Sequence, residues 1–389
     1  MPEVQVKATV KQEPPPAPPA PPTPTLPSTD GKRSFIGVII AVVVLVVAVA
    51  ALAGYGYSRM SVPKVVSQPV APAPVVAQPL IIGLSIADFR ESRWRAERDI
   101  MTAEASKLGA TVVSMSADGD ASLQEAQVKN LMLQGAKVLI VVPQDAEKAA
   151  AIVDDAHQNG VKVIAYDRLI KNSDLDYYVT FDSTKVGVDE AQGVLDAAGG
   201  KGNFAYIGGS PTDNNAALVR NGSFQVLQPK IDSGAVKIVL DKQIDNWDAT
   251  LAYQTVKGFL DKGGKLDAAV VANDGMAGGV IQALREHGLA GKVPVSGQDA
   301  ELRACHDLIT GDQTLTVYKP LKQLATEAVH MAIAAAGGQP IQTNMTVNNG
   351  KTDVPSRLLD VVAVTKANLD STVIQDGLYT HADVYGTKP

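Results

Sequence analysis

From residue 80 onward, the sequence repeats a short apolar segment followed by a longer segment of helical periodicity. The short segments are apolar on both faces, which is typical of parallel strands covered by helices on either side. The strands we expect are 80–87, 111–117, 137–143, 161–167, 202–209, 235–244, 266–274, 293–299 and 314–320. Between two of them, one helical stripe is formed by Ala149, Ile152, Val153 and Ala156. This alternation predicts an α/β fold of two similar doubly wound parallel-sheet lobes.

The N-terminal part of the chain has a different composition. Residues 1–33 contain ten prolines, which predicts an extended leader without a hydrophobic core. Residues 34–58 are uncharged and mostly apolar, and about 20 such residues span a bilayer. We therefore expect one transmembrane anchor, with a signal sequence as the alternative. Residues 59–79 contain five prolines and predict a stalk.

Composition and charge exclude several classes of protein. The formal net charge is −6 and no basic stripe occurs, so we expect no nucleic-acid partner. The single cysteine, Cys305, excludes an internal disulfide, and we expect it to be a small buried residue in a helix. The five histidines lack metal-ligand spacing, and no GxSxG, GxGxxG or GxxxxGK[ST] motif is present. We therefore expect no catalytic residues, no metal and no cofactor.

Polar and aromatic residues follow the carboxyl ends of the expected strands, the edge at which open parallel sheets bind ligands. The residues found there are Asp88, Arg93, Trp94, Asp167, Arg168, Asp213, Asn214, Asn215, Trp247, Asn273, Asp274, Asp299 and Lys319. They include the only two tryptophans of the chain, one in each expected lobe. Indole rings stack on the apolar faces of a pyranose, and carboxylate, amide and cationic groups match its hydroxyl rim. This edge therefore predicts a sugar site.

Several of these residues also have a structural interpretation. Either tryptophan alone could be a partly buried surface aromatic side chain. Asp167 and Arg168 could form a salt bridge at the hinge between the lobes. Lys319 could pair only with a carboxylate, and we expect Asp274 to be a cap or a hinge contact rather than a direct ligand of the sugar.

The segments that carry these residues resemble a known family. Residues 80–389 resemble the ribose/galactose-type periplasmic binding proteins of bacterial ABC importers, and among them the D-xylose-binding members. The resemblance is carried by RWRAERD, AYDRLI, FDSTKVG, GGSPTDNNA, VVANDGMAGGVIQAL, SGQDAEL, TVYKP and VPSRLL. Of Asn214 and Asn215, we expect one to cap the next helix, and the resemblance favours the second as a ligand. The sugar-binding residues it implies are Arg93, Trp94, Asp167, Arg168, Asn215, Trp247, Asn273, Asp299 and Lys319.

The resemblance also implies that the chain crosses between the lobes three times, forming a three-segment hinge. We expect these crossings near residues 181–183, 319–320 and 343–349. Contacts from both lobes to one ligand would couple lobe closure to binding. The expected lobes are 80–182 plus 320–346 for lobe 1, and 183–319 plus 347–389 for lobe 2.

The function that the resemblance implies is capture of a sugar outside the cytoplasm. D-xylose is the first expectation, with glucose, ribose or arabinose as alternatives, and an ABC transporter permease would receive the sugar. The apolar run at 34–58 would hold the protein at the periplasmic or extracellular face of the cytoplasmic membrane. The alternative is a membrane-tethered sugar receptor that serves a sensor or chemoreceptor without transport.

Overall fold

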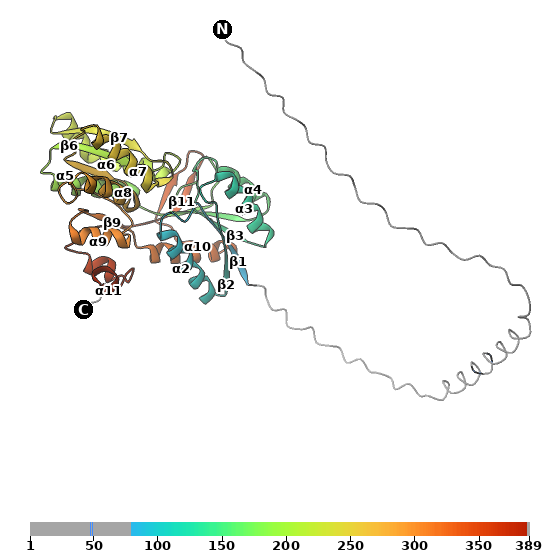
Figure 1. Cartoon of the computed structure of the whole chain (residues 1–389). Helices are drawn as coiled ribbons and strands as arrows, with labels where there is room; N and C mark the ends of the chain where they lie inside the picture. Colours follow the sequence, from blue (N-terminus) through green and yellow to red (C-terminus); the bar gives the residue numbers. More distant parts are fainter. Residues whose placement is uncertain (1–46, 48, 50–78, 387–389) are drawn as a thin grey trace, which may run out of the picture. The chain divides into compact units, whose positions relative to one another are not determined.

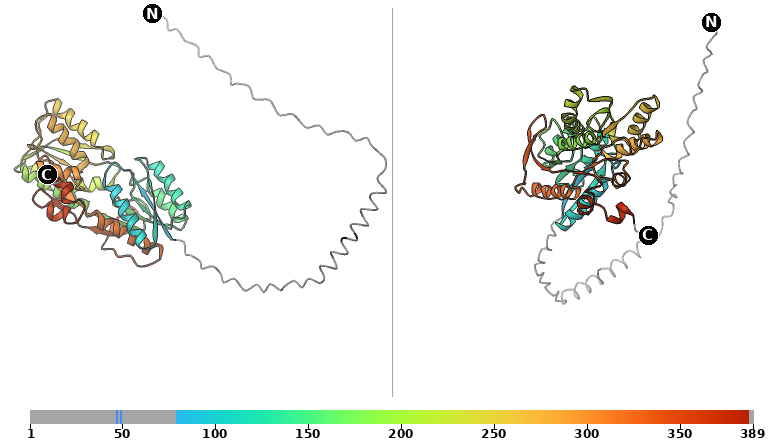
Figure 2. Two further views of the ribbon diagram at one scale, coloured as in Figure 1. Left: turned by 60° about the horizontal axis from the view of Figure 1, so that its bottom comes forward. Right: turned by 90° about the vertical axis from the view of Figure 1, so that its left-hand side faces the viewer.

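The computed structural model describes residues 47, 49 and 79–386, and residues 79–386 belong to one compact unit. The leader, nearly all of the apolar run at 34–58 and the stalk up to residue 78 lie outside the described residues. Within the described part of the chain, no helix is both long and apolar enough to cross a membrane. From β1 onward the chain forms two α/β lobes, as Figures 1 and 2 show.

Lobe 1 is built on a seven-stranded sheet with the strand order β10-β11-β5-β4-β3-β1-β2. Neighbouring strands are parallel, except that β10 runs antiparallel to β11. In β3, Ile140 belongs to one hydrophobic cluster and Leu139 and Val141 to another, because successive side chains point to opposite faces. The strands are β1 Leu80–Ile86, β2 Ala110–Ser116, β3 Val138–Val141, β4 Lys162–Tyr166, β5 Tyr177–Phe181, β10 Met345–Asn348 and β11 Asp353–Leu359.

Helices pack against this sheet. Helix α2 (Arg93–Lys107) contacts α10 (Leu321–Ala336), and α10 also contacts β3, β4 and β5. Helix α3 (Ala121–Leu133) contacts β1 and β2 as well as α4 (Ala150–Gln158), which lies against β4. The predicted helical stripe is confirmed, since all four of its side chains are buried: Ala149, Ile152, Val153 and Ala156.

Lobe 2 contains a three-stranded parallel sheet of order β7-β6-β8 and an antiparallel pair, β12-β9. Single bridges from Val295 to β8 and from Gln298 to β9 join the two parts. The expected strand at 293–299 is reduced to these bridges, because Pro294 lacks an N–H and Asp299 has a left-handed backbone. The strands are β6 Gly202–Gly208, β7 Val236–Gln243, β8 Ala268–Val271, β9 Thr316–Tyr318 and β12 Val362–Val364.

The helices of lobe 2 pack mainly in pairs, α5 with α6 and α7 with α8. The last part of the chain covers α9, and this contact buries the single cysteine, Cys305, as predicted. The helices are α5 Ser183–Ala197, α6 Asn214–Asp232, α7 Ala249–Asp261, α8 Asp274–Glu286, α9 Leu302–Thr310 and α11 His381–Tyr385, with a 3₁₀ turn at Asp245–Trp247 and a π turn at Asp370–Ile374.

The chain passes between the lobes after β5, after β9 and after β11. The first two passages lie between Phe181 and Ser183 and between Tyr318 and Leu321. The third was predicted near 343–349, with residues 347–389 in lobe 2, and this prediction is wrong. Strand β11 pairs in parallel with β5 and completes the lobe 1 sheet, so the chain crosses only after Leu359.

Candidate functional site

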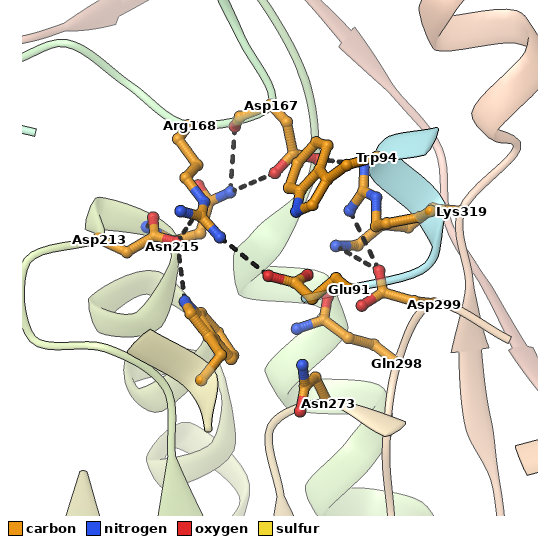
Figure 3. Close-up of a pocket in the computed structure, with 12 residues that line it drawn as sticks. Glu91, Trp94, Asp167, Arg168, Asp213, Asn215, Asn273, Gln298, Asp299 and Lys319 are labelled. Atoms are coloured by element: carbon orange, nitrogen blue, oxygen red, sulfur yellow. Dashed lines mark hydrogen bonds and ion pairs between the residues drawn. The ribbon is translucent and has the colours of Figure 1, made fainter. Parts of the chain in front are cut away.

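A cavity lies between the lobes, at the carboxyl ends of their strands (Figure 3). Three lining residues were not predicted as ligands: Glu91, Asp213 and Gln298. All nine predicted residues line the same cavity: Arg93, Trp94, Asp167, Arg168, Asn215, Trp247, Asn273, Asp299 and Lys319.

Strand ends and the first turns of helices place these side chains. Helix α2 begins at Arg93, so Arg93 and Trp94 occupy its first turn. Asp167 and Arg168 directly follow β4. In lobe 2 the residue that caps α6 is neither of the two expected asparagines but Asp213, whose side chain accepts a hydrogen bond from the Asn215 backbone N–H at 2.9 Å.

Asn273 combines two roles. It is the N-cap of α8, and its Oδ1 accepts a hydrogen bond from the Met276 backbone N–H at 2.9 Å. Since this cap satisfies one of the orphan donors of the first helical turn, the side-chain amide is held in a fixed position. The same residue lines the cavity.

Arg93 is surrounded by carboxylates from both lobes. Its Nη2 donates to Glu97 at 2.7 Å and to Asp167 at 2.8 Å. Its Nη1 donates across the cleft to Asp299 at 3.1 Å, and Lys319 binds the same carboxylate at 3.0 Å. Lys319 thus pairs with a carboxylate and also lines the cavity.

Arg168 makes the second connection across the cleft. Its Nε lies 2.9 Å from an oxygen of Asp213, and its Nη2 donates to Glu91 at 3.0 Å. The Asp213 carboxylate also accepts a hydrogen bond from the indole Nε1 of Trp247 at 3.1 Å. Within the described residues, Arg168 therefore forms its ion pairs with Glu91 and Asp213, rather than the proposed hinge salt bridge with Asp167.

The two tryptophans are both buried, with 2% of Trp94 and 9% of Trp247 exposed. The Trp94 ring lies beneath the Arg93 guanidinium at 4.3 Å and near that of Arg168 at 5.4 Å. Cation–π attraction of this kind explains why a tryptophan occurs within a charged stretch of sequence. The interpretation of either ring as a partly buried surface aromatic side chain is wrong.

The position of the Trp247 ring depends on the backbone at Gly209 and at Trp247 itself. A Cβ added to Gly209 would lie only 2.2 Å from the Trp247 ring, so the ring needs a glycine at that position. Trp247 itself has a φ of 56°, in the left-handed region that L-residues rarely adopt. Asp167 (60°) and Asp299 (96°) share that region, and such strain is found preferentially at functional sites.

Three buried polar atoms of cavity residues have no hydrogen-bond partner within the described residues. They are two donors, Arg93 Nε and Trp94 Nε1, and one acceptor, Asn215 Oδ1. Buried polar groups are nearly always satisfied, so this set indicates a ligand that both accepts and donates hydrogen bonds. Figure 3 shows Asp213 and Asn215 on one side of the cavity, with Asp299 and Lys319 on the opposite side.

The charges of the site favour a neutral ligand. Three cationic side chains face four lining carboxylates and the adjacent Glu97, so an anion would meet an excess of negative charge. Burial raises the pKa of Glu91 and of Glu97 to about 7, against the attraction of Arg168 and Arg93, respectively. For Asp167 the cationic side chains, Arg93 first, outweigh burial and lower the pKa. Among the described residues, no group of three or more His, Cys, Asp or Glu side chains could hold a metal ion.

Comparison with known proteins places this chain in a family. A model of the periplasmic binding protein domain matches residues 82–340. The D-xylose-binding periplasmic protein of Haemophilus influenzae is 45% identical to this chain, over 79% of this chain and 92% of the relative. The D-xylose-binding periplasmic protein of Escherichia coli is 42% identical, over 79% of this chain and 93% of the relative. A carbohydrate transporter solute-binding protein from Chloroflexus aurantiacus, solved in complex with D-glucose, is similar with a TM-score of 0.74 and 34% identity, over 79% of this chain and 98% of that one. The chain therefore belongs to the periplasmic binding protein family.

Proposed function

We propose that the protein binds a neutral monosaccharide, D-xylose first, in the cavity between its lobes. The observation that supports this most directly is the mixed set of unpartnered buried atoms, Arg93 Nε, Trp94 Nε1 and Asn215 Oδ1, beside two buried indole rings. A sugar hydroxyl both donates and accepts hydrogen bonds, so a sugar offers a partner for the two donors and for the acceptor. The ring C–H faces of the same molecule pack on indole.

D-xylose is preferred on the names of the two relatives with 45% and 42% identity. The glucose complex of the Chloroflexus aurantiacus protein, at 34% identity, makes D-glucose the second candidate. The relatives are binding proteins, and the ion pairs of the cavity hold its acidic groups in place, so we assign the chain a receptor role rather than an enzymatic one.

Binding and lobe closure are linked in this proposal. Residues from both lobes line the cavity, so a ligand that contacts both stabilises the closed arrangement. The closed protein would then be what an ABC permease recognises when it takes up the sugar from the periplasm. A ligand that touched only one lobe would shift this equilibrium very little.

The test uses the purified full chain in mild detergent and follows tryptophan fluorescence during titration with D-xylose, D-glucose, D-ribose and L-arabinose. Both tryptophans of the chain line the cavity, so the emission reports on this site. A saturable change with D-xylose at micromolar or lower concentration supports the proposal. Folded protein that responds to none of the four sugars would contradict it.

We further propose that residues 34–58 anchor the protein in the cytoplasmic membrane, with the binding domain on the outer side. The support is the sequence itself, an uncharged run long enough to span a bilayer of about 30 Å. Extraction of membranes with alkaline carbonate is the measurement. An anchored protein stays in the pellet, whereas release into the supernatant would contradict anchoring and favour a cleaved signal.

A further inference from the structure

The segment that carries Asp299 has a strained backbone. Asp299 and Ala300 are consecutive residues with φ values of 96° and 50°. A left-handed conformation is less favourable than the right-handed one for a non-glycine residue. Asp299 is the lobe 2 carboxylate that binds both Arg93 and Lys319. A specific set of contacts must therefore hold this segment in place.

Those contacts converge on Asp274, a buried residue that lies next to the ligand position Asn273 and does not line the cavity. Its Oδ2 accepts hydrogen bonds from the Glu301 backbone N–H at 2.9 Å and from the Thr316 hydroxyl at 2.7 Å. Its backbone N–H donates to the Gln298 carbonyl at 3.0 Å. Asp274 thus binds the chain on both sides of residues 299 and 300.

Two more contacts complete the clamp. The Thr316 hydroxyl, held by Asp274, accepts a hydrogen bond from the Ala300 backbone N–H at 3.1 Å. Gln313 Nε2 donates to Asp274 Oδ1 at 2.7 Å. The backbone passes so close to this carboxylate that a Cβ on Gly297 would lie 2.1 Å from Asp274 Oδ1. The contacts therefore fix residues 297–301 directly against α8.

We infer that Asp274 is a positioning residue of the binding site: its carboxylate holds Asp299 and Ala300 in the left-handed conformation that presents the Asp299 carboxylate to the cavity. This inference rests on the proposed sugar-binding function. In the absence of Asp274, residues 299–300 relax toward right-handed or extended backbone, and Asp299 leaves Arg93 and Lys319. Sugar affinity then falls although no residue of the cavity wall has changed.

The test compares sugar affinity and thermal stability of the purified full chain, both followed by tryptophan fluorescence. Asp274→Asn replaces one of the two acceptor oxygens with a donor NH2 group, and we expect at least a tenfold loss of affinity for the sugar that the unmodified protein binds. Ala300→Gly in the same variant lowers the cost of the left-handed backbone, and we expect it to restore affinity at least threefold. Thr316→Val, a milder change, should weaken binding severalfold. It replaces Asp274→Asn as the test variant if Asp274→Asn does not fold.

Asp120→Asn is the matched control, because Asp120 also accepts backbone N–H groups at a helix N-terminus but lies exposed on lobe 1. We expect it to leave affinity unchanged. Affinity of Asp274→Asn within twofold of the unmodified protein would overturn the inference, and so would a loss that Ala300→Gly does not reduce. If the unmodified protein binds no sugar, it is the proposed function that fails.

Discussion

The two lobes line the cavity with side chains of different character. Lobe 1 contributes both arginines, and each one pairs with a carboxylate of lobe 2: Arg93 with Asp299 and Arg168 with Asp213. Within the described residues, the lobe 2 part of the wall carries no arginine or lysine before Lys319, which lies at the second crossing. The two arginines that join the lobes by ion pairs are thus on one side of the cleft and their carboxylate partners on the other. A neutral donor, Asn215 of lobe 2, bonds in the opposite direction to Asp167 of lobe 1.

This difference has a mechanistic consequence. When the lobes part, each arginine keeps a carboxylate of its own lobe, Glu97 and Asp167 for Arg93 and Glu91 for Arg168. Within the described part of the chain, Asp213 has no cationic partner in lobe 2, whereas Asp299 retains Lys319. The Arg168–Asp213 ion pair therefore exists only when the lobes are closed, and there burial raises the pKa of Asp213 against the attraction of Arg168.

The largest effect is expected from breaking the Arg93 connection. Arg93→Met leaves Glu97, Asp167 and Asp299 near one another without their shared cation, and removal of one partner from a buried ion pair destabilises by about 3–5 kcal/mol. We expect the free energy of unfolding, measured with urea, to fall by that amount, and sugar affinity to fall at least a hundredfold. Arg95→Met, on the exposed side of the same helix, is the control and should change neither. Unaltered stability of Arg93→Met would contradict the central role of this guanidinium.

Trp247→Ala tests the aromatic contribution of lobe 2. Loss of the ring removes the stacking surface and the hydrogen bond to Asp213, and we expect at least tenfold weaker sugar binding by a folded protein. Trp247→Phe keeps an aromatic face without the N–H and should retain an intermediate affinity. Binding is measured by calorimetry, because the fluorescence of these variants comes from Trp94 alone. Equal affinity of Trp247→Ala and the unmodified protein would rule out stacking.

Two glutamates of lobe 1, Glu91 and Glu97, predict that the stability of the protein depends on pH. Burial raises the pKa of Glu97 and Glu91 to about 7 in the folded protein, from 4.5. Between these values the folded state holds more protons than the unfolded state, so these groups make stability fall as pH rises from about 4.5 to about 7. Urea unfolding at a series of pH values measures this slope. Glu97→Gln should flatten it, and an unchanged slope would mean that Glu97 does not take up the proton.

The smallest effect concerns a neutral contact across the cleft. Gln144 Nε2 of lobe 1 donates to Asn246 Oδ1 of lobe 2 at 2.8 Å. A neutral hydrogen bond contributes about 0.5–1.5 kcal/mol, so Gln144→Ala should weaken sugar binding two- to tenfold, as measured by calorimetry. A loss as large as that of Arg93→Met would show that closure depends on neutral contacts as much as on ion pairs.

The position of the cavity could be predicted because its polar and aromatic residues follow strands in the chain, and the family resemblance selected nine of the residues that line it. Glu91 was missed because it lies among other charged residues, in FRESRWRAERD, where nothing distinguishes a buried carboxylate from an exposed one. The partners of Arg168 could not be predicted either, since Asp213 comes from the other lobe and the contact exists only in three dimensions. The third crossing was misplaced because β11 pairs with β5, more than 170 residues earlier, and its local pattern does not reveal which sheet it joins.

The left-handed backbone at Trp247 limits how the specificity of this receptor can be redesigned. A designer who wishes to admit a bulkier sugar would first shorten this side chain. A β-branched replacement such as valine would remove the ring and would also be strained by the backbone φ near 56°. Glycine would adopt this backbone conformation without strain, but it would provide no side chain to contact the ligand. Selection for new ligands should therefore retain an aromatic residue at 247 and concentrate its changes on Glu91 and Gln298, whose backbones are unstrained.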